Sequence, residues 1–354
     1  MTSPLTAAGP GRPVPGAGPA RATPPAGGAG TAGPRRPAPG ATVPVRVAGW
    51  SLHLPDAGAL AVDLADWSGV SPQRLSEALA GAVPADRAHE TLGRKGLLYK
   101  EPATRLALCA VHRALGLPPG RTRPAEVDPA TAVVVAGNLG NVATVAGLVR
   151  TVRAEGGRAV SPLAAPNASS NVLSSTIGLW FGFGAANLML CSGATAGLDA
   201  VRAATLLLRA GRAERVLVVG AEPADEVATG LHQAGRASML RAGAACLVLT
   251  CAAGTGVGPA LSPADAHRAT CLLGPGGFDP ATRWGDCYGA AGVVNLALAA
   301  ALLDAGAAGP IAVACGDDTD GRRETLLGTG AVPETTTPDG RCAAILDGGP
   351  GADR

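Results

Sequence analysis

The chain has 354 residues, of which 47% are hydrophobic, enough to bury the core of one large domain or two closely joined ones. Only 3% are aromatic, so alanine, valine and leucine must fill that core. The net charge of +2 argues against a nucleic-acid binder that works by broad electrostatic attraction. The longest apolar run, residues 293–303, is too short to span a bilayer, and no signal peptide is recognisable, so the sequence predicts a cytoplasmic protein with no membrane partner.

Strand-like and helix-like segments alternate after an opening tail. Residues 1–43 are rich in proline, alanine and glycine and carry no acidic residue, a composition typical of disorder. The expected strands are residues 45–49, 131–136, 188–191, 215–220, 244–250 and 311–315. The expected helices are residues 102–115, 171–181, 194–210 and 289–303. This alternation predicts a layered α/β fold.

The chain has eight cysteines, and their spacing predicts no metal site. No pair has the C-x-x-C spacing of a zinc site, and no histidine lies near enough in sequence to complete one. Most of these cysteines lie in apolar runs, which favours reduced, buried thiols. We expect neither a metal ion nor a cofactor.

Residues 188–220 combine a strand, a tight turn of small residues, a long helix and a second strand. Such a turn directs one side chain at the N-terminus of the helix. The helix dipole and free amides at that end stabilise a thiolate and lower its pKa. A junction of this kind suits a cysteine nucleophile.

Three stretches carry a family resemblance. Between Asn171 and Glu222, several glycines and the run Gly197-Leu198-Asp199 fall without a gap at the spacing of the β-ketoacyl synthases, especially type II polyketide ketosynthases and chain-length factors. Residues 241–249 resemble the G-E-G-A-G-A-L-V-L strand of that family, and residues 285–292 resemble its G-H-x-x-G-A-A-G motif. The resemblance implies a thiolase-like layered α-β-α-β-α fold, with halves at residues 44–250 and 251–354, the second half shortened.

The resemblance places an alanine where the family has its nucleophile. In the family, the nucleophilic cysteine stands at a fixed spacing before the glycine that ends its helix, here Gly211, and that spacing falls on Ala194. Cys191 would then end the preceding strand as a buried thiol, and it is the fallback nucleophile. The resemblance also implies that Gly193, Thr195 and Asp317 contact the acyl chain or its carrier.

The family's two catalytic histidines are also missing. Asp286 stands at the second histidine position, where a carboxylate would repel both the malonyl group and the developing enolate. The H-G-T motif of the first histidine is absent, and the shortened segment before Gly285 keeps only His267, which we interpret as a surface residue.

The closing G-F-G-G-T-N loop of the family is replaced by an acidic loop, residues 316–321. If the family motifs meet in this fold, Asp317, Asp318 and Asp320 converge with Asp286. Such a cluster would bind Mg²⁺ or a cationic substrate, although a solvated acidic loop is the commoner outcome.

Three functions remain open from the sequence. The first is a non-condensing partner subunit, like a chain-length factor, in a homodimer or a heterodimer with a catalytic ketosynthase and served by an acyl carrier protein. The second is an acyltransferase or other altered-chemistry enzyme that uses Cys191 or Asp286 on acyl thioesters. The third is a stand-alone binder of an acyl chain or carrier protein.

Overall fold

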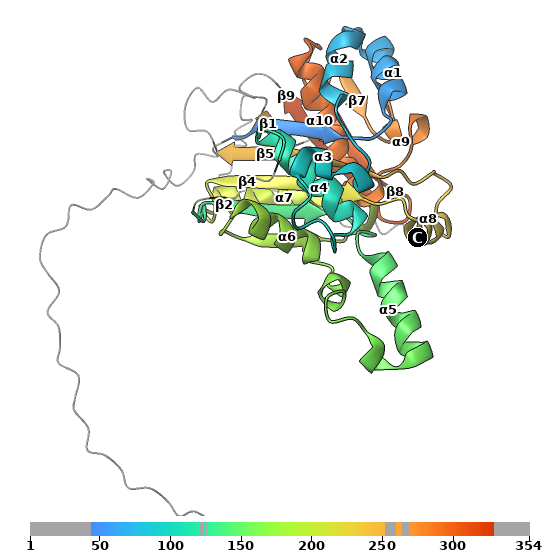
Figure 1. Cartoon of the computed structure of the whole chain (residues 1–354). Helices are drawn as coiled ribbons and strands as arrows, with labels where there is room; N and C mark the ends of the chain where they lie inside the picture. Colours follow the sequence, from blue (N-terminus) through green and yellow to red (C-terminus); the bar gives the residue numbers. More distant parts are fainter. Residues whose placement is uncertain (1–43, 121–123, 125, 252–259, 264–268, 329–354) are drawn as a thin grey trace, which may run out of the picture. The chain divides into compact units, whose positions relative to one another are not determined.

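The computed structural model describes residues 44–120, 124, 126–251, 260–263 and 269–328 (Figure 1). These residues all belong to one compact unit. The strands are β1 (Val45–His53), β2 (Thr131–Ala136), β3 (Asn187–Leu190), β4 (Arg215–Glu222), β5 (Gly243–Cys251), β6 (Ala260–Pro263), β7 (Cys271–Leu273), β8 (Ile311–Asp317) and β9 (Gly321–Gly328). The helices are α1 (Gly58–Ser68), α2 (Pro72–Leu79), α3 (His89–Leu92), α4 (Pro102–Ala114), α5 (Val142–Glu155), α6 (Val172–Phe181), α7 (Ala196–Arg209), α8 (Glu226–Gln233), α9 (Pro280–Arg283) and α10 (Ala291–Asp304).

The described strands form a mixed sheet in the order β3-β2-β4-β5-β1-β6-β9-β8-β7. Strands β3, β2 and β4 are parallel, as are β7 and β8, and the other neighbouring pairs are antiparallel. Strands β2, β4 and β5 are almost continuously apolar because helices cover both of their faces. Strand β3 ends the ladder on one side and is partly exposed.

Alternate residues of the inner strands face two different helical layers. Val133 and Val219 pack into the cluster that includes α4 and α6, whereas Val134 and Val218 pack into the cluster that includes α7 and α10. Helix α10 contacts β1, β4 and β5 and also contacts β8 and β9. The pair α7 and α10 therefore forms a central layer between the first five strands and the later ones.

Helices α7 and α10 approach each other through two glycines. A Cβ atom on Gly197 would lie 2.7 Å from the Cα of Gly292, and a Cβ on Gly292 would lie 2.8 Å from the backbone nitrogen of Leu198. Only residues without a side chain allow this backbone contact. The crossing sets the head of α7 beside the head of α10.

The predicted layered α/β fold, shortened in its second half, is confirmed. The described residues after β5 form two α-helices, the four-residue α9 and the longer α10. Helix α10 belongs to the central layer. Residues 252–259 and 264–268 belong to the segment where the family places its first histidine, and they lie outside the described residues. His267 therefore lies outside them, as do residues 1–43. No helix in the described part of the chain is long and apolar enough to cross a membrane.

Candidate active site

The site is built at the turn that joins β3 to α7. Cys191 and Ser192 follow β3, and residues Gly193–Thr195 form one turn of 3₁₀-helix before α7 begins. Gly193 has φ of +65°, a left-handed conformation that favours glycine. Ala194, at the predicted nucleophile position, is buried with 8% of its surface exposed and offers only a methyl group. The predicted junction is present, but its reactive side chain is not.

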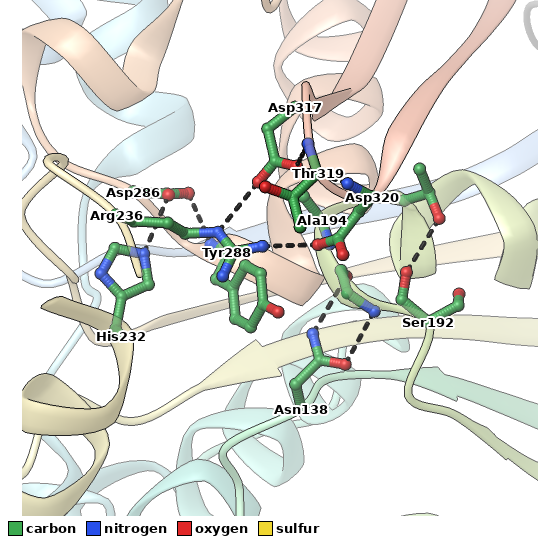
Figure 2. A network of polar contacts seen from close by, with 12 residues as sticks. Asn138, Ser192, Ala194, His232, Arg236, Asp286, Tyr288, Asp317, Thr319 and Asp320 are labelled. Carbon is green, nitrogen blue, oxygen red and sulfur yellow. Dashed lines mark hydrogen bonds and ion pairs between the residues drawn. The ribbon is translucent and has the colours of Figure 1, made fainter. Parts of the chain in front are cut away.

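Asn138, just beyond β2, fixes this turn with a paired contact. Its Oδ1 accepts a hydrogen bond from the Gly193 N–H at 3.1 Å, and its Nδ2 donates to the Gly193 carbonyl at 3.0 Å (Figure 2). Beneath it lies the fully buried carboxylate of Glu222, which accepts hydrogen bonds from the backbone N–H groups of Asn138 and Leu139 at 2.6 and 3.0 Å. These bonds tie the ends of β2 and β4 to the head of α7.

The acidic loop between β8 and β9 closes over Ala194. The backbone N–H of Ala194 donates to Oδ2 of Asp320 at 2.7 Å. The same carboxylate oxygen accepts a hydrogen bond from Arg236 at 2.6 Å, and the Arg236 Nε donates to Asp317 at 2.9 Å (Figure 2). The guanidinium also lies over the ring of Tyr288, 4.2 Å from its centroid. Two of the predicted carboxylates therefore converge, and one arginine of the chain pairs with both.

The charges in this group stabilise one another. Although partial burial opposes its ionisation, backbone N–H donors from Asp320 and Thr319, together with Arg236, hold the pKa of Asp317 below its ordinary value. Burial also opposes the charge on Arg236, yet Tyr288 and the two aspartates raise its pKa. Asp318 is exposed on the same turn. Among the described residues, no group of three or more histidine, cysteine or acidic side chains is arranged to hold a metal ion.

Asp286 has hydrogen-bond partners other than Arg236. Its Oδ2 lies 3.1 Å from His232 Nε2 and accepts a hydrogen bond from the Ser238 hydroxyl at 2.9 Å. Its Oδ1 accepts the backbone N–H of Tyr288, a residue with an unusual φ of +40°. The His232 side chain is fully buried. A histidine is thus present near the second histidine position, but it belongs to α8 and is paired with the aspartate.

The prediction that Cys191 is buried is wrong. Cys191 does follow β3, as predicted, but β3 is an end strand in the described sheet and the thiol is exposed. Partial desolvation and the nearby Glu222 raise the pKa of this thiol above its ordinary value. It borders a cavity of only about 10 Å³ that Asn138 and Met189 also line.

The three residues predicted to contact an acyl chain or its carrier lie in different surroundings. Thr195 is buried, and its hydroxyl lies within hydrogen-bond distance of two acceptors, the Ser192 carbonyl at 2.9 Å and the Asp199 carboxylate at 2.8 Å. Gly193 lies against the acidic loop, and Asp317 is part of that loop. Their predicted contact with an acyl chain or carrier remains a prediction.

Sequence reasoning missed two central residues of the site. Arg236 follows α8 in a glycine-containing connection with no periodic pattern, and His232 looks like any polar residue near a helix end. Both act on partners at least 54 residues away in sequence. The only available signal in the sequence was the unusual Asp-Asp-Thr-Asp loop, which needs a cation as its partner.

Known structures share this fold at low identity. The chain is similar to the ishigamide ketosynthase/chain length factor (18% identity, TM-score 0.61, covering 81% of this chain and 99% of that one). It is also similar to a type II polyketide synthase acyl-carrier protein in complex with its ketosynthase bound to the hexaketide (17% identity, TM-score 0.59, 81% and 99%). A third similar structure is an oxazolomycin ketosynthase domain from Streptomyces albus (14% identity, TM-score 0.52, 82% and 96%).

No curated protein sequence matches the chain significantly. The family model for the beta-ketoacyl synthase N-terminal domain matches residues 61–259, more than half of the chain. That stretch contains the Ala194 turn and strands β2 to β5, but not β1. The chain therefore belongs to the β-ketoacyl synthase family.

Proposed function

We propose that this chain is a non-condensing ketosynthase-like subunit that pairs with an active β-ketoacyl synthase, in the manner of a chain-length factor. The observation that carries the proposal is the head of α7. Ala194 supplies no nucleophile, and its backbone amide already donates to the Asp320 carboxylate. Condensation needs a thiolate to hold the acyl chain and cationic or neutral donors to stabilise the enolate.

The remaining chemistry of the site supports the same conclusion. Asp286 is anchored by His232 and Ser238 and carries a carboxylate where the family has an imidazole. A cavity beside Cys191 has a volume of about 10 Å³, and a cavity beside Cys287 has a volume of about 20 Å³. A cavity of that size holds about one water molecule, whereas an acyl chain needs a far larger tunnel.

The edge of the sheet supports pairing with another subunit. Strand β3 ends the described ladder and leaves backbone groups on one side available for pairing. Leu188 on β3 is 39% exposed, and Leu179 on the neighbouring α6 is 86% exposed. Exposed apolar side chains beside an open strand edge are typical of an interface that a partner covers.

The exposed surface of helix α5 also favours pairing with another subunit. None of its residues is buried, and its valines at positions 145, 149 and 152 are 38%, 44% and 47% exposed along one side of the helix. It extends away from the sheet with the following 3₁₀ turns (Figure 1).

We propose that the partner is a catalytic ketosynthase rather than a second copy, because two copies would bring no nucleophile to the dimer. An acyl carrier protein in the cytosol would deliver its substrates.

Co-expression with a catalytic ketosynthase of the same biosynthetic system tests the proposal. We expect a 1:1 complex by size-exclusion chromatography with mass measurement, and a product whose chain length depends on this subunit. Leu188→Lys should abolish the complex. Val62→Lys, which changes an exposed apolar residue on α1, should leave it intact. A β-ketoacyl product from the isolated, contaminant-free chain would overturn the proposal.

A second function is favoured by one observation, the exposure of Cys191. An exposed thiol beside the active-site turn would suit an acyltransferase that carries its acyl group on Cys191. The raised pKa argues against this, because an activated cysteine has a lowered one.

Alkylation separates the two functions. We expect Cys191 to react first among the described cysteines because it is exposed, but at the rate of an unactivated thiol and with an apparent pKa above 8.5, roughly the value for a free cysteine. We also expect no acyl adduct after exposure to acyl thioesters. An adduct on Cys191, lost in Cys191→Ser, would favour the acyltransferase.

A further inference from the structure

The backbone amide of Ala194 has an anionic partner inside the protein. The amide lies in the turn of 3₁₀-helix that leads into α7, and an N–H at such a position attracts negative charge. Here the charge comes from Oδ2 of Asp320, at 2.7 Å. The approach depends on the missing side chain of Gly193, because a Cβ there would lie 2.1 Å from the same oxygen.

The Asp320 carboxylate is held in this position from two further segments. Arg236 donates to the same oxygen at 2.6 Å and to Asp317 at 2.9 Å. Asp317 Oδ1 in turn accepts the backbone N–H groups of Thr319 and Asp320 at 2.9 and 2.7 Å, which shapes the loop that presents Asp320. Tyr288, from the segment before α10, supports the guanidinium face. The contact is thus fixed by residues from three separate parts of the chain.

We propose that Asp320 is an internal anion that occupies the amide at the head of α7 in place of a substrate oxygen or a nucleophile thiolate, and that Arg236 holds it there. The chain then lacks condensing chemistry for two separate reasons, the missing cysteine and the carboxylate at the amide. Replacing the missing cysteine would not recover an activated thiol, because the position that should stabilise its negative charge already faces a carboxylate.

The groups around position 194 determine how a thiol there would titrate. Asp320 and Asp317 are negative, and the buried Glu222 lies below the turn. Arg236 is the positive group that contacts this loop, and its bonds go to the two aspartates. Tyr288 is neutral near pH 7, since burial raises its pKa. Asp199 and Arg323, which also lie at the head of α7, form an ion pair at 3.0 Å and offset each other. Glu222 keeps its proton at pH 7 because burial raises its pKa to about 8. Two carboxylates against one guanidinium therefore leave a negative surrounding, which disfavours a thiolate.

This inference rests on the proposed function for its meaning but can fail separately from it. It predicts the acidity of a thiol in the isolated chain, which needs neither a partner subunit nor a carrier protein. Complex formation with a ketosynthase could succeed while the thiol result fails, or the reverse.

The test places a thiol at position 194 in a Cys191→Ser background. The rate of iodoacetamide labelling at that position is followed from pH 6 to 10 by peptide mass mapping. With Ala194→Cys in this background and no further change, we expect the new thiol to have an apparent pKa at or above that of a free cysteine. Adding Asp320→Asn, which removes the charge and keeps the shape, should lower that pKa by about one unit, which is about tenfold more thiolate at pH 7.

Two comparisons make the result specific. Asp318→Asn removes the same charge from an exposed position on the same turn, and we expect it to change labelling less than about threefold, because exposed charges are screened. Arg236→Gln should raise the pKa instead, so the prediction can be checked even if the Asp320 variant does not fold. A thiol that is already acidic beside Asp320, or equal effects of the Asp320 and Asp318 variants, would overturn the inference.

Discussion

Glu222 is an acid at the base of the site whose ionisation opposes folding. Burial raises the pKa of its carboxyl to about 8, and the backbone N–H donors and the nearby Asp286 modify that value without reversing it. An unfolded glutamate has a pKa of about 4.3, so the folded chain retains a proton that the unfolded chain releases. The stability that this proton contributes is complete below about pH 4.3 and is lost as the pH rises through 8.

We expect this loss to be visible in thermal unfolding between pH 5 and pH 8.5. The wild-type chain should lose roughly 2–4 kcal/mol relative to Glu222→Gln over that range, at about 1.4 kcal/mol per pKa unit. Glu214→Gln, at an exposed position, should follow the wild type. If the Glu222 and Glu214 variants show the same pH dependence, Glu222 is not the group responsible.

Local spacing in the sequence predicted where Ala194 lies in the fold, in the turn before α7. The position of Ala194 at the head of α7 follows from a strand, a turn and a helix that are contiguous in the chain. The exposure of Cys191 could not be read in the same way, because its apolar neighbours suit a central strand as well as an end strand. Strand order, which decides between the two, is a property of the whole sheet.

The ionic group could be predicted only in part. The acidic residues of the closing loop were visible in the sequence, and their convergence followed from the family's motifs. Their partner Arg236 was not visible, because it lies 81 residues before Asp317 and no local pattern links them. The pairing of a cation with a loop at this distance is fixed by the tertiary fold alone.

At the scale of elements, the contact between α7 and α10 should be highly sensitive to side-chain size. Gly197→Ala places a methyl group against the backbone of Gly292, where neither helix can yield without moving the central layer. We expect a destabilisation of about 1–3 kcal/mol or more in urea unfolding. The change would also displace the head of α7.

Gly147→Ala on α5 is the matched control for that substitution. This glycine is also helical, but a Cβ there meets nothing within 4 Å. We expect it to stabilise the helix by about 0.5–1 kcal/mol, since alanine loses less backbone entropy. Equal destabilisation by both variants would mean that the close helix crossing is not the cause.

Elements were predictable where burial makes them regular. Strand β2 has the predicted bounds, and α6 and α10 begin within two residues of their predicted starts, because each is mostly buried. Helix α5 and strand β9 were not predicted. Helix α5 has no buried residue, and the first half of β9 is charged and exposed, so neither carries a strong hydrophobic period.

For the whole molecule, the division of the chain at residue 250 remains a prediction. Strand β5 ends at Cys251, and the later strands β7, β8 and β9 lie on the far side of α10. The sequence indicated two halves only through the family resemblance, because the halves have diverged beyond a visible repeat. Their junction depends on long-range pairing that no local pattern reveals.

The short strand β6 makes that junction part of one hydrogen-bonded ladder. Leu261 pairs with Val45 of β1 on one side and with Leu327 of β9 on the other. Because this strand and the α7–α10 layer both join the halves, neither half can open without breaking contacts of the other. The described body should therefore behave as a single cooperative unit, without a half-folded intermediate.

Two probes of denaturant unfolding, circular dichroism and tryptophan fluorescence, should accordingly give one coincident transition. Leu261→Pro removes a backbone N–H from the middle of the ladder and should separate the transition into two stages. Leu261→Ala keeps that N–H and should preserve a single stage. If the two probes already disagree in the wild type, the halves are independent folding units, and a subunit of this kind could lose or exchange its second half without unfolding its first.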